Sequence, residues 1–394
     1  MVAAIIFLLL STLVFNSPTV LKGETNEASF IIKTSVTYYN NGTGNWVFKD
    51  EDRAISLFMN NTWQTVHLTY HSHPLERFDT DEDGNPIAVL KFLEAEIEPG
   101  KSISYAVTYY ALSKPRFLPL NISEENSRNL DDIPEELIER YCGEGDPWLV
   151  NDQELQDLAY NIAKGETNVL TIVKKFITWI RDPDNIRYKT HETPMYPNET
   201  YTKREGDCDD QAILFVTLCR ILGIPSYLQI GCIYMPTTTP TQNKYWEDHL
   251  TISLKHIGWH GWAMVYIPPW EWLPVDLTYV LDGHSDPLNA IKNAAVTSQK
   301  TLQYMNISQM DYVTSSRGCR DFFKNNGFYV YAQYEMTQTL PESLLDVIIE
   351  KLEELFPWIL VTAIVVVTVV IAGISMYLRK EKKLKHSKWI IANP

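Results

Sequence analysis

The sequence predicts an α+β protein with a β-rich N-terminal part, a mixed middle part and an apolar run near the C-terminus. Between residues 28 and 112, short segments alternate apolar and polar residues, and turn sequences such as Asn40-Asn41-Gly42 separate them. This alternation is typical of strands, and we expect an immunoglobulin-like β-sandwich over residues 25–112. From residue 151 onward apolar residues recur at helical spacing, which predicts helices packed against a second core.

Composition and charge narrow the functional classes. With 394 residues the chain is long enough for about two domains with cores of their own. Hydrophobic residues make up 45% and charged residues 21%, as in a globular protein rather than a disordered one. The net charge of −15 argues against nucleic acid as the main partner, because phosphate contacts need a basic patch.

The two ends of the chain predict a secreted protein with a membrane anchor. Residues 1–20 contain an apolar run of signal-peptide length, with an uncleaved anchor as the second interpretation. An acidic amphipathic helix at 341–357 leads into an uncharged run at 358–378, which is long enough to cross a bilayer. The tail 379–394 has six Lys or Arg against one Glu, so the positive-inside rule places it in the cytoplasm and the large domains outside the cell.

Residues 79–84, Asp-Thr-Asp-Glu-Asp-Gly, imitate the start of an EF-hand calcium loop. The twelfth position of that loop is Leu90 in place of Glu, and strands rather than helices are predicted on both sides. We therefore interpret the segment as a solvated hairpin turn, and we expect no cofactor.

The middle of the chain divides into a linker and a second domain. Residues 113–150 are polar and punctuated by Pro, and are predicted to be a linker that packs on the domain at 151–340. That domain opens with two amphipathic helices at about residues 151–165 and 169–182. The segment 187–203, rich in Tyr and Pro, is expected to form one wall of a cleft.

The segment Gly206-Asp207-Cys208 introduces the most informative helix. Residues 213–222 are apolar on every side, which predicts a helix buried in a core and ended by Gly223. Cys208 then lies in the first turn, where unpaired backbone N–H groups favour the reactive thiolate. Asp209 and Asp210 act in the opposite direction, because nearby carboxylates raise the pKa of a thiol. A reactive Cys208 therefore needs an imidazole or cationic partner.

The segment 259–278 supplies such a partner. It is predicted to form two short strands around the turn Pro268-Pro269-Trp270, with His260 on the first strand and Asp276 at the end of the second. Paired strands bring these two side chains together despite their separation in sequence. Cysteine, histidine and aspartate then form the nucleophile, base and orienting residue of a thiol acyl-transfer enzyme.

Two alternatives remain open at the sequence level. His249 and His256 compete with His260 for the role of base, although the Trp-rich context and the spacing to Asp276 favour His260. A metal site made of Cys208 and the three histidines lacks regular ligand spacing and is disfavoured, so we expect no metal.

Together, Gly206-Asp207-Cys208, the motif His260-x-Trp262-x-x-Val265-Tyr266 and the motif Trp272-x-Pro274-Val275-Asp276-x-Thr278 resemble the transglutaminase-like superfamily. The resemblance covers roughly residues 150–282 and implies a papain-like core with Cys208 as nucleophile, His260 as general base and acid, and Asp276 as its orienting partner. Members of such families commonly have an aromatic or basic residue where Gln211 stands, a departure expected to affect substrate contacts more than the triad.

The chain has five cysteines. If Cys208 is catalytic, the other four allow three disulfide connectivities. Cys219 lies on the apolar helix and is expected to be a buried free thiol. The others are Cys142, Cys232 and Cys319.

The sequence therefore predicts a cell-surface, single-pass thiol enzyme that acts on amide or peptide bonds of a protein or peptide substrate. Hydrolysis, by a peptidase or deamidase, is favoured modestly over cross-linking to a lysine amine, because an exposed cleft always contains water. The alternative is a catalytically silent surface binding or scaffold protein that retains the fold, since each of the three residues taken alone has an ordinary structural explanation.

Overall fold

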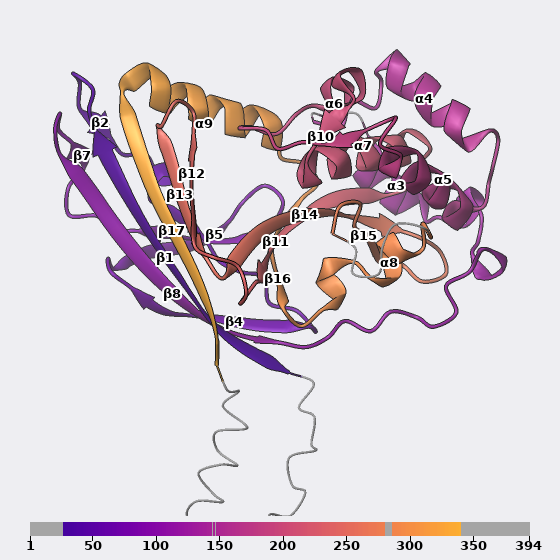
Figure 1. The fold of residues 1–394 in the computed structure, drawn as a ribbon, viewed down its shortest axis with the longest axis horizontal. Helices are drawn as coiled ribbons and strands as arrows, with labels where there is room; N and C mark the ends of the chain where they lie inside the picture. The colour runs from indigo at the N-terminus through magenta and orange to yellow at the C-terminus, as the bar shows by residue number, and fades with distance from the viewer. Residues whose placement is uncertain (1–26, 144, 146, 280–285, 340–394) are drawn as a thin grey trace, which may run out of the picture. The chain divides into compact units, whose positions relative to one another are not determined.

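The computed structural model describes residues 27–143, 145, 147–279 and 286–339, which all belong to one compact unit, residues 1–339. These residues form a mixed α/β fold (Figure 1). The predicted export signal at 1–20, juxtamembrane helix at 341–357, membrane span at 358–378 and tail at 379–394 lie outside the described residues. Within the described ranges, no helix is long and apolar enough to cross a membrane.

The largest sheet joins the two ends of the described chain. Its central strand β1 (Ala28–Asn40) pairs antiparallel with both β8 (Ser102–Ser113) and β17 (Phe328–Thr339). The strand order is β12-β13-β17-β1-β8-β4. The remaining strands are β4 (Gln64–His71), β12 (Thr241–Tyr245) and β13 (Leu250–Lys255). Strands from both sides of the predicted linker therefore share one sheet. The domain bounds at residues 112, 150 and 340 remain predictions.

A second β layer packs on this sheet. It contains the three-stranded sheet β3-β6-β5 and the two-stranded sheet β2-β7. Its core is strongly aromatic: Trp46 is 1% exposed and stacks on Phe328 with ring centroids 4.6 Å apart. Such rings bury much apolar surface and favour stacked or edge-on contacts. The strands are β2 (Trp46–Val47), β3 (Ala54–Ser56), β5 (Leu75–Thr80), β6 (Pro86–Leu90) and β7 (Glu96–Ile97).

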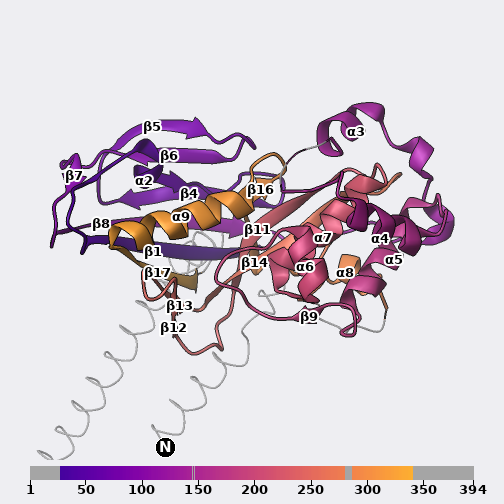
Figure 2. The same cartoon turned by 90° about the horizontal axis from the view of Figure 1, so that it is seen from above.

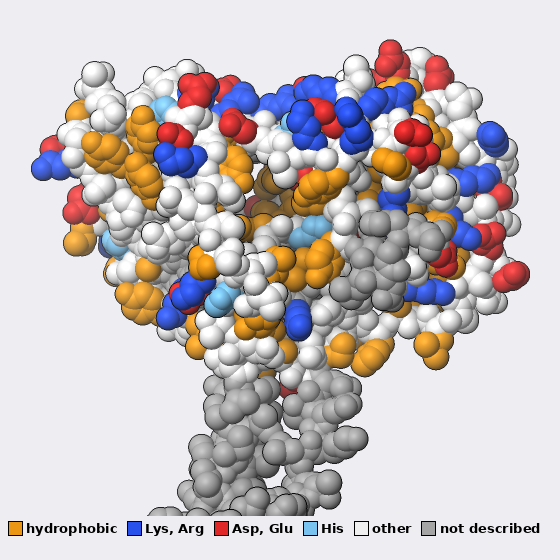
Figure 3. Space-filling model, viewed as in Figure 1, with side chains coloured by type: hydrophobic (Ala, Val, Ile, Leu, Met, Phe, Trp, Pro, Cys, Tyr) orange, Lys and Arg blue, Asp and Glu red, His pale blue; other side chains and the backbone are white. Residues whose placement is uncertain are grey.

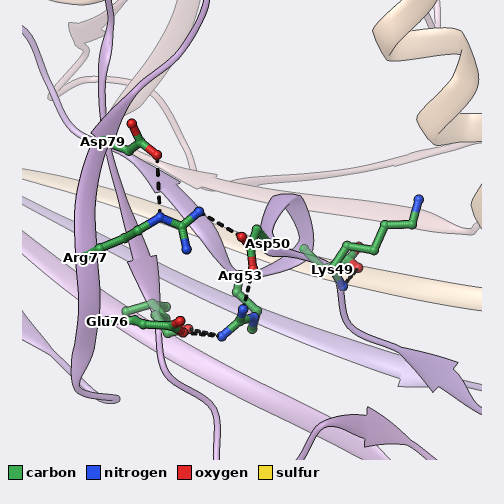
Figure 4. Close-up of polar contacts among 8 residues, drawn as sticks. Lys49, Asp50, Arg53, Glu76, Arg77 and Asp79 are labelled. Atoms are coloured by element: carbon green, nitrogen blue, oxygen red, sulfur yellow. Dashed lines mark hydrogen bonds and ion pairs between the residues drawn. The ribbon is translucent and has the colours of Figure 1, made fainter.

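Ion pairs fasten the short helix α2 (Asp50–Arg53) to the hairpin β5–β6 (Figure 4). Asp50 lies 2.5 Å from Arg53 and 2.8 Å from Arg77. Arg53 also reaches Glu76 at 2.6 Å. Because the charges are shared in a network, one ordered side chain serves two contacts, and the network stabilises α2 more than an isolated surface pair would.

The calcium-like segment is a hairpin turn, as predicted, but it is not a solvated one. The Asp83 carboxylate accepts hydrogen bonds from Ser308 Oγ (2.8 Å), Gln309 N (2.7 Å) and Met310 N (3.1 Å). Asn85 is 2% exposed and exchanges two hydrogen bonds with the Asn306 backbone. The polar groups of the turn thus hold the hairpin against the end of β16 (Thr301–Ile307) and the residues that follow it.

A four-stranded sheet of order β15-β14-β11-β16, covered by helices, forms the other main core. Its strands are β11 (Ser226–Tyr234), β14 (Ile257–Tyr266), β15 (Trp272–Val275) and β16. The predicted helices begin at side-chain caps, because Asp152 and Asn168 accept hydrogen bonds from the first-turn amides. The helices are α3 (Glu135–Tyr141), α4 (Gln153–Ala163), α5 (Val169–Arg181), α6 (Pro197–Lys203), α7 (Cys208–Ile221), α8 (Asn289–Lys292) and α9 (Tyr312–Asn326).

The predicted linker is packed rather than extended. It contains α3, and its Trp148 is 1% exposed, donating an indole hydrogen bond of 2.9 Å to the Ser308 carbonyl oxygen. All five cysteines are free thiols, so none of the three possible disulfide connectivities is formed. The expectation that Cys219 is a buried free thiol is confirmed.

Candidate active site

Polar side chains of helix α7 hold the turn that comes just before the first residue of the helix, Cys208. Asp207 is the N-cap, and Asp210 Oδ2 accepts from the Asp207 backbone N–H at 3.2 Å. Gln211 Nε2 donates to the Gly206 carbonyl oxygen at 2.9 Å. Gln211 is 4% exposed, so in this structure it braces the turn before the cysteine, and the expectation that it affects substrate contacts finds no support in its position.

The first turn of α7 lies directly against β14 at Gly261. A Cβ placed on Gly261 would come within 3.2 Å of the Asp209 Cβ and 3.1 Å of Ile230 Cδ1, so only glycine allows this approach without a shift. The Gly261 N–H is directed at the Cys208 sulfur and favours its thiolate form. Since Gly261 follows His260, this contact brings the cysteine next to the histidine-bearing part of β14.

His260 and Asp276 meet as expected. His260 Nε2 lies 2.9 Å from Asp276 Oδ2, and the two side chains are 8% and 0% exposed. Asp276 also accepts backbone hydrogen bonds from Tyr279 N (3.0 Å), Thr278 N (3.3 Å) and Ala295 N (3.1 Å). Four donors therefore hold this carboxylate in place.

The carboxylate fixes the tautomer of the imidazole. An ionised Asp276 can only accept, so His260 Nε2 carries the proton of that hydrogen bond. The other ring nitrogen, Nδ1, is then unprotonated in the neutral ring and is the one able to take a proton from a thiol. This arrangement fits the predicted base and orienting residue.

Carboxyl groups surround the cysteine. Burial raises the pKa of the Cys208 thiol well above its ordinary value, and the carboxylates of Asp209 and Asp207 raise it further. Burial, with Asp209 next in importance, also raises the pKa of the Asp207 and Asp210 carboxyls. The Cys208 sulfur lies 3.9 Å from Asp209 Oδ1. At neutral pH the resting cysteine is therefore a thiol, and the helix N-terminus does not prevail over its acidic neighbours.

The segment between α5 and α7 packs on this helix start, as the predicted cleft wall would. β9 (Arg187–Tyr188) pairs parallel with β10 (Glu205–Gly206). Met195 N donates to Asp210 Oδ1 at 2.7 Å, and His191 N lies 3.4 Å from Asp207 Oδ2. His191 was missed from the sequence, where its only signal is its position in a Tyr- and Pro-rich loop.

A second residue missed from the sequence is Tyr312, the first residue of α9. Burial raises the pKa of its phenol well above the ordinary value, and Asp209 and Cys208 raise it further, which places the ring beside the cysteine turn. Tyr312 lies about 100 positions after Cys208 in a segment of mixed polarity, so no local pattern marked it.

The competing histidines are engaged elsewhere. His249 Nδ1 lies 2.7 Å from the Phe328 carbonyl oxygen, and its ring stacks on Tyr329 at 4.3 Å. His256 occupies the turn between β13 and β14 with a φ of 57°. Among the described residues, the side chains close enough to hold a metal ion jointly are Asp207, Cys208 and Asp209, with ligand atoms within 4.8 Å of one another. The disfavoured site of one cysteine and three histidines is not assembled among them.

Comparison with known proteins agrees with the resemblance noted in the sequence. Residues 156–277 match the family model of the transglutaminase-like superfamily. This segment is transglutaminase-like. It includes Cys208, His260 and Asp276. No curated protein matches the chain in sequence.

Solved structures that match the chain include a candidate cysteine protease from Cytophaga hutchinsonii, with 18% identity, 80% of this chain and 90% of that chain covered, and a TM-score of 0.48. The periplasmic domain of TgpA from Pseudomonas aeruginosa matches with 14% identity over 65% of this chain and 89% of that chain, with a TM-score of 0.31. Legionella pneumophila LapG matches with 17% identity over 51% of this chain and 98% of that chain, with a TM-score of 0.26.

The face of the molecule seen in Figure 1 is hollowed near its middle (Figure 3). Hydrophobic and histidine side chains are visible inside the hollow, and Lys and Arg side chains gather along its upper rim. The hollow lies between the β12–β13 pair and the helices α6 and α7 in this view, on the side of the transglutaminase-like segment.

Proposed function

We propose that the protein is a thiol enzyme that acts on amide or peptide bonds through Cys208, His260 and Asp276. The observation that carries the proposal is the hydrogen bond of 2.9 Å between His260 Nε2 and Asp276 Oδ2, because it leaves Nδ1 as a base on the strand that touches the cysteine turn. The match of residues 156–277 to the transglutaminase-like superfamily supports the same chemistry.

The acidic surroundings of Cys208 define how the first step would proceed. The thiol attacks the amide carbon while its proton passes to His260 Nδ1, so no preformed thiolate is required. The resulting imidazolium is stabilised by Asp276 and gives its proton to the departing amine or ammonia. An acyl thioester on Cys208 remains, and an acceptor activated by His260 then releases the acyl group.

The acceptor separates hydrolysis from transfer. Water gives a peptidase or deamidase, and a lysine amine gives a cross-linking acyltransferase. Water as the acceptor is the preferred form of the proposal, since excluding it needs a closed site. Incubation with a peptide library, with and without an amine donor, tests the choice by mass: hydrolysis adds water or releases ammonia, whereas transfer adds the donor.

The location is part of the proposal. The charge asymmetry around residues 358–378 and the apolar residues 1–20 support a single-span anchor with the large domain outside the cell. Protease treatment of intact cells tests this, because removal of the large domain is expected and its full protection would contradict the topology.

The silent scaffold remains the second candidate, and the raised thiol pKa is the observation that favours it. The two are separated by alkylation with iodoacetamide. An active Cys208 reacts at neutral pH faster than buried Cys232, because His260 accepts the thiol proton, and His260→Ala slows the reaction, whereas His67→Ala on the exposed part of β4 does not. A Cys208 that is as inert as buried Cys232 in every variant would reject the enzyme and leave the scaffold.

A further inference from the structure

A cavity of about 550 Å³ lies between α9 and the N-terminal β layer, apart from the cysteine site. This size is ordinary for a small-molecule site. One side comes from Tyr38 on β1 and the segment around α2, and the other comes from α9 (Figure 2). The lining residues on α9 are Ser315, Gly318, Cys319, Phe322 and Phe323.

The helical side of the cavity has room because its residues are small. Positions 315, 318, 319 and 322 fall on one face of a helix, and the first three of them are Ser, Gly and Cys. A Cβ built on Gly318 would meet nothing within 4 Å, so the space beside it is open. Phe322 closes the far end of this face and is 37% exposed.

Aromatic rings form much of the wall. Phe322 and Phe323 have ring centroids 5.7 Å apart, and both contact Trp46, which also contacts Tyr38 at 5.0 Å. The Tyr38 hydroxyl interacts with Tyr105. Aromatic faces of this kind attract weakly hydrated cations.

Acidic groups supply the complementary charge. Asp52 and Glu51 line the cavity together with Lys49, which gives the lining a net charge of −1. Glu51 and Lys49 pair with each other at 3.1 Å, and their side chains are 74% and 70% exposed. Asp52 is the inner acid: it accepts from the Lys49 backbone N–H at 2.8 Å, and burial raises the pKa of its carboxyl.

The Trp46 indole lies beside Asp52. Its N–H is buried and close enough to the carboxylate to favour the charged form of Asp52. The ion pairs of Asp50, Arg53, Glu76 and Arg77 fix α2, and therefore Asp52, before any ligand arrives (Figure 4). A preformed carboxylate next to aromatic rings loses little entropy on binding.

We propose that this cavity binds a quaternary ammonium group, held by Phe322, Phe323 and Tyr38 and neutralised by Asp52. A quaternary ammonium donates no hydrogen bonds and is weakly hydrated, so it suits walls made of rings and one inner carboxylate. An uncharged ligand would leave the charge of Asp52 uncompensated, and an anion would be repelled by it.

Cys319 serves as a reporter inside the cavity. Its alkylation by iodoacetamide in the full-length chain is followed by peptide mass spectrometry at mildly alkaline pH, with Cys142 as the reference thiol in the same digest. The probe is choline, compared at equal ionic strength with sodium chloride and with the uncharged alcohol in which carbon replaces the choline nitrogen. Choline is expected to slow Cys319 by at least about fivefold and to leave Cys142 unchanged, whereas the alcohol and the salt do neither.

Two variants separate the ligand from a general effect on the fold. Asp52→Asn keeps the shape and removes the charge, so choline should bind about tenfold more weakly. Gly318→Leu fills the open space and should abolish the protection, while Asp321→Asn on the same helix should retain it. Equal protection by choline and its uncharged analogue, or full protection in Asp52→Asn, would overturn the proposal. Cys208 takes no part in the readout, so this result is independent of the proposed enzyme activity.

Discussion

Asp209→Asn should make Cys208 more reactive at neutral pH. The substitution keeps the size of the side chain and removes the carboxylate 3.9 Å from the sulfur, one of the two charges that raise the thiol pKa. Two unit charges at that separation repel each other by about 1 kcal/mol in water and about 4 kcal/mol at an effective dielectric constant of 20. The half-buried cysteine lies between these two limits.

The expected rate follows from this energy. Every 1.4 kcal/mol, roughly, changes the thiolate population tenfold. The thiolate of a more acidic thiol is also a weaker nucleophile. With a Brønsted coefficient of about 0.5, this loss cancels half of the logarithm of the gain in thiolate population. Alkylation by iodoacetamide at neutral pH should therefore be about two- to fortyfold faster in the variant. The rate gain of the variant depends on pH. It exists only below the thiol pKa of the unmodified protein, and it disappears above that pKa because both proteins are then thiolates.

The assay is the alkylation rate of Cys208 as a function of pH, read by peptide mass spectrometry. The midpoint of the profile should move to lower pH in Asp209→Asn. Asp184→Asn is the matched control, because Asp184 is exposed and far from α7 in sequence. An unchanged midpoint, or a slower reaction at neutral pH, would refute the electrostatic account of the cysteine turn.

Three further predictions test the fold and its charges. Gly231→Ala places a Cβ 2.3 Å from a carbonyl oxygen of β16, so it should lower the free energy of unfolding by about 3 kcal/mol. In Gly318→Ala the new Cβ meets nothing within 4 Å, so this substitution should raise the free energy of unfolding slightly. Urea titrations measure both changes. Asp83→Ala removes three hydrogen bonds and should lower the free energy of unfolding by about 3 kcal/mol. Asp79→Ala removes only an exposed ion pair with Arg77 and should lower it by less than about 1 kcal/mol. Equal losses would contradict the role given to the hairpin. The Asp207 carboxyl has its pKa raised in the folded state, so its contribution to stability falls as pH rises from its unfolded value of 3.8. Asp207→Asn should flatten the pH dependence of the urea midpoint, and an identical slope would argue against the raised pKa.

Local patterns carried much of the prediction. The period-two segments became strands, and Asp152 and Asn168 cap helices close to their expected starts. The run of residues 213–222, predicted to be apolar on every side, became a helix as far as Ile221, and its residues are buried as far as Arg220. These features depend on contacts between residues a few positions apart or on burial as such, which a sequence records directly.

Other features depend on residues distant in sequence. Nothing in the alternation of residues 28–40 indicates that its partner is residues 328–339. The calcium-like turn appeared free in the sequence because its acceptors are met by residues 308–310, more than 200 positions away. The acidic residues of the cysteine turn were visible in the sequence. Whether the helix N-terminus lowers the thiol pKa or the carboxylates raise it depends on burial, which the sequence does not show.

The sequence alone determined which residues are candidates for chemistry at this site. Cys208 is placed by Gly206 and Asp207 at a helix start, and His260 and Asp276 are placed on successive strands, because caps, turns and periodicity are local properties. Only the tertiary structure decided their state. The contact at Gly261, the four donors around Asp276 and the packing of His191 and Tyr312 on the cysteine turn arise from long-range packing, and desolvation and charge act through space rather than along the chain.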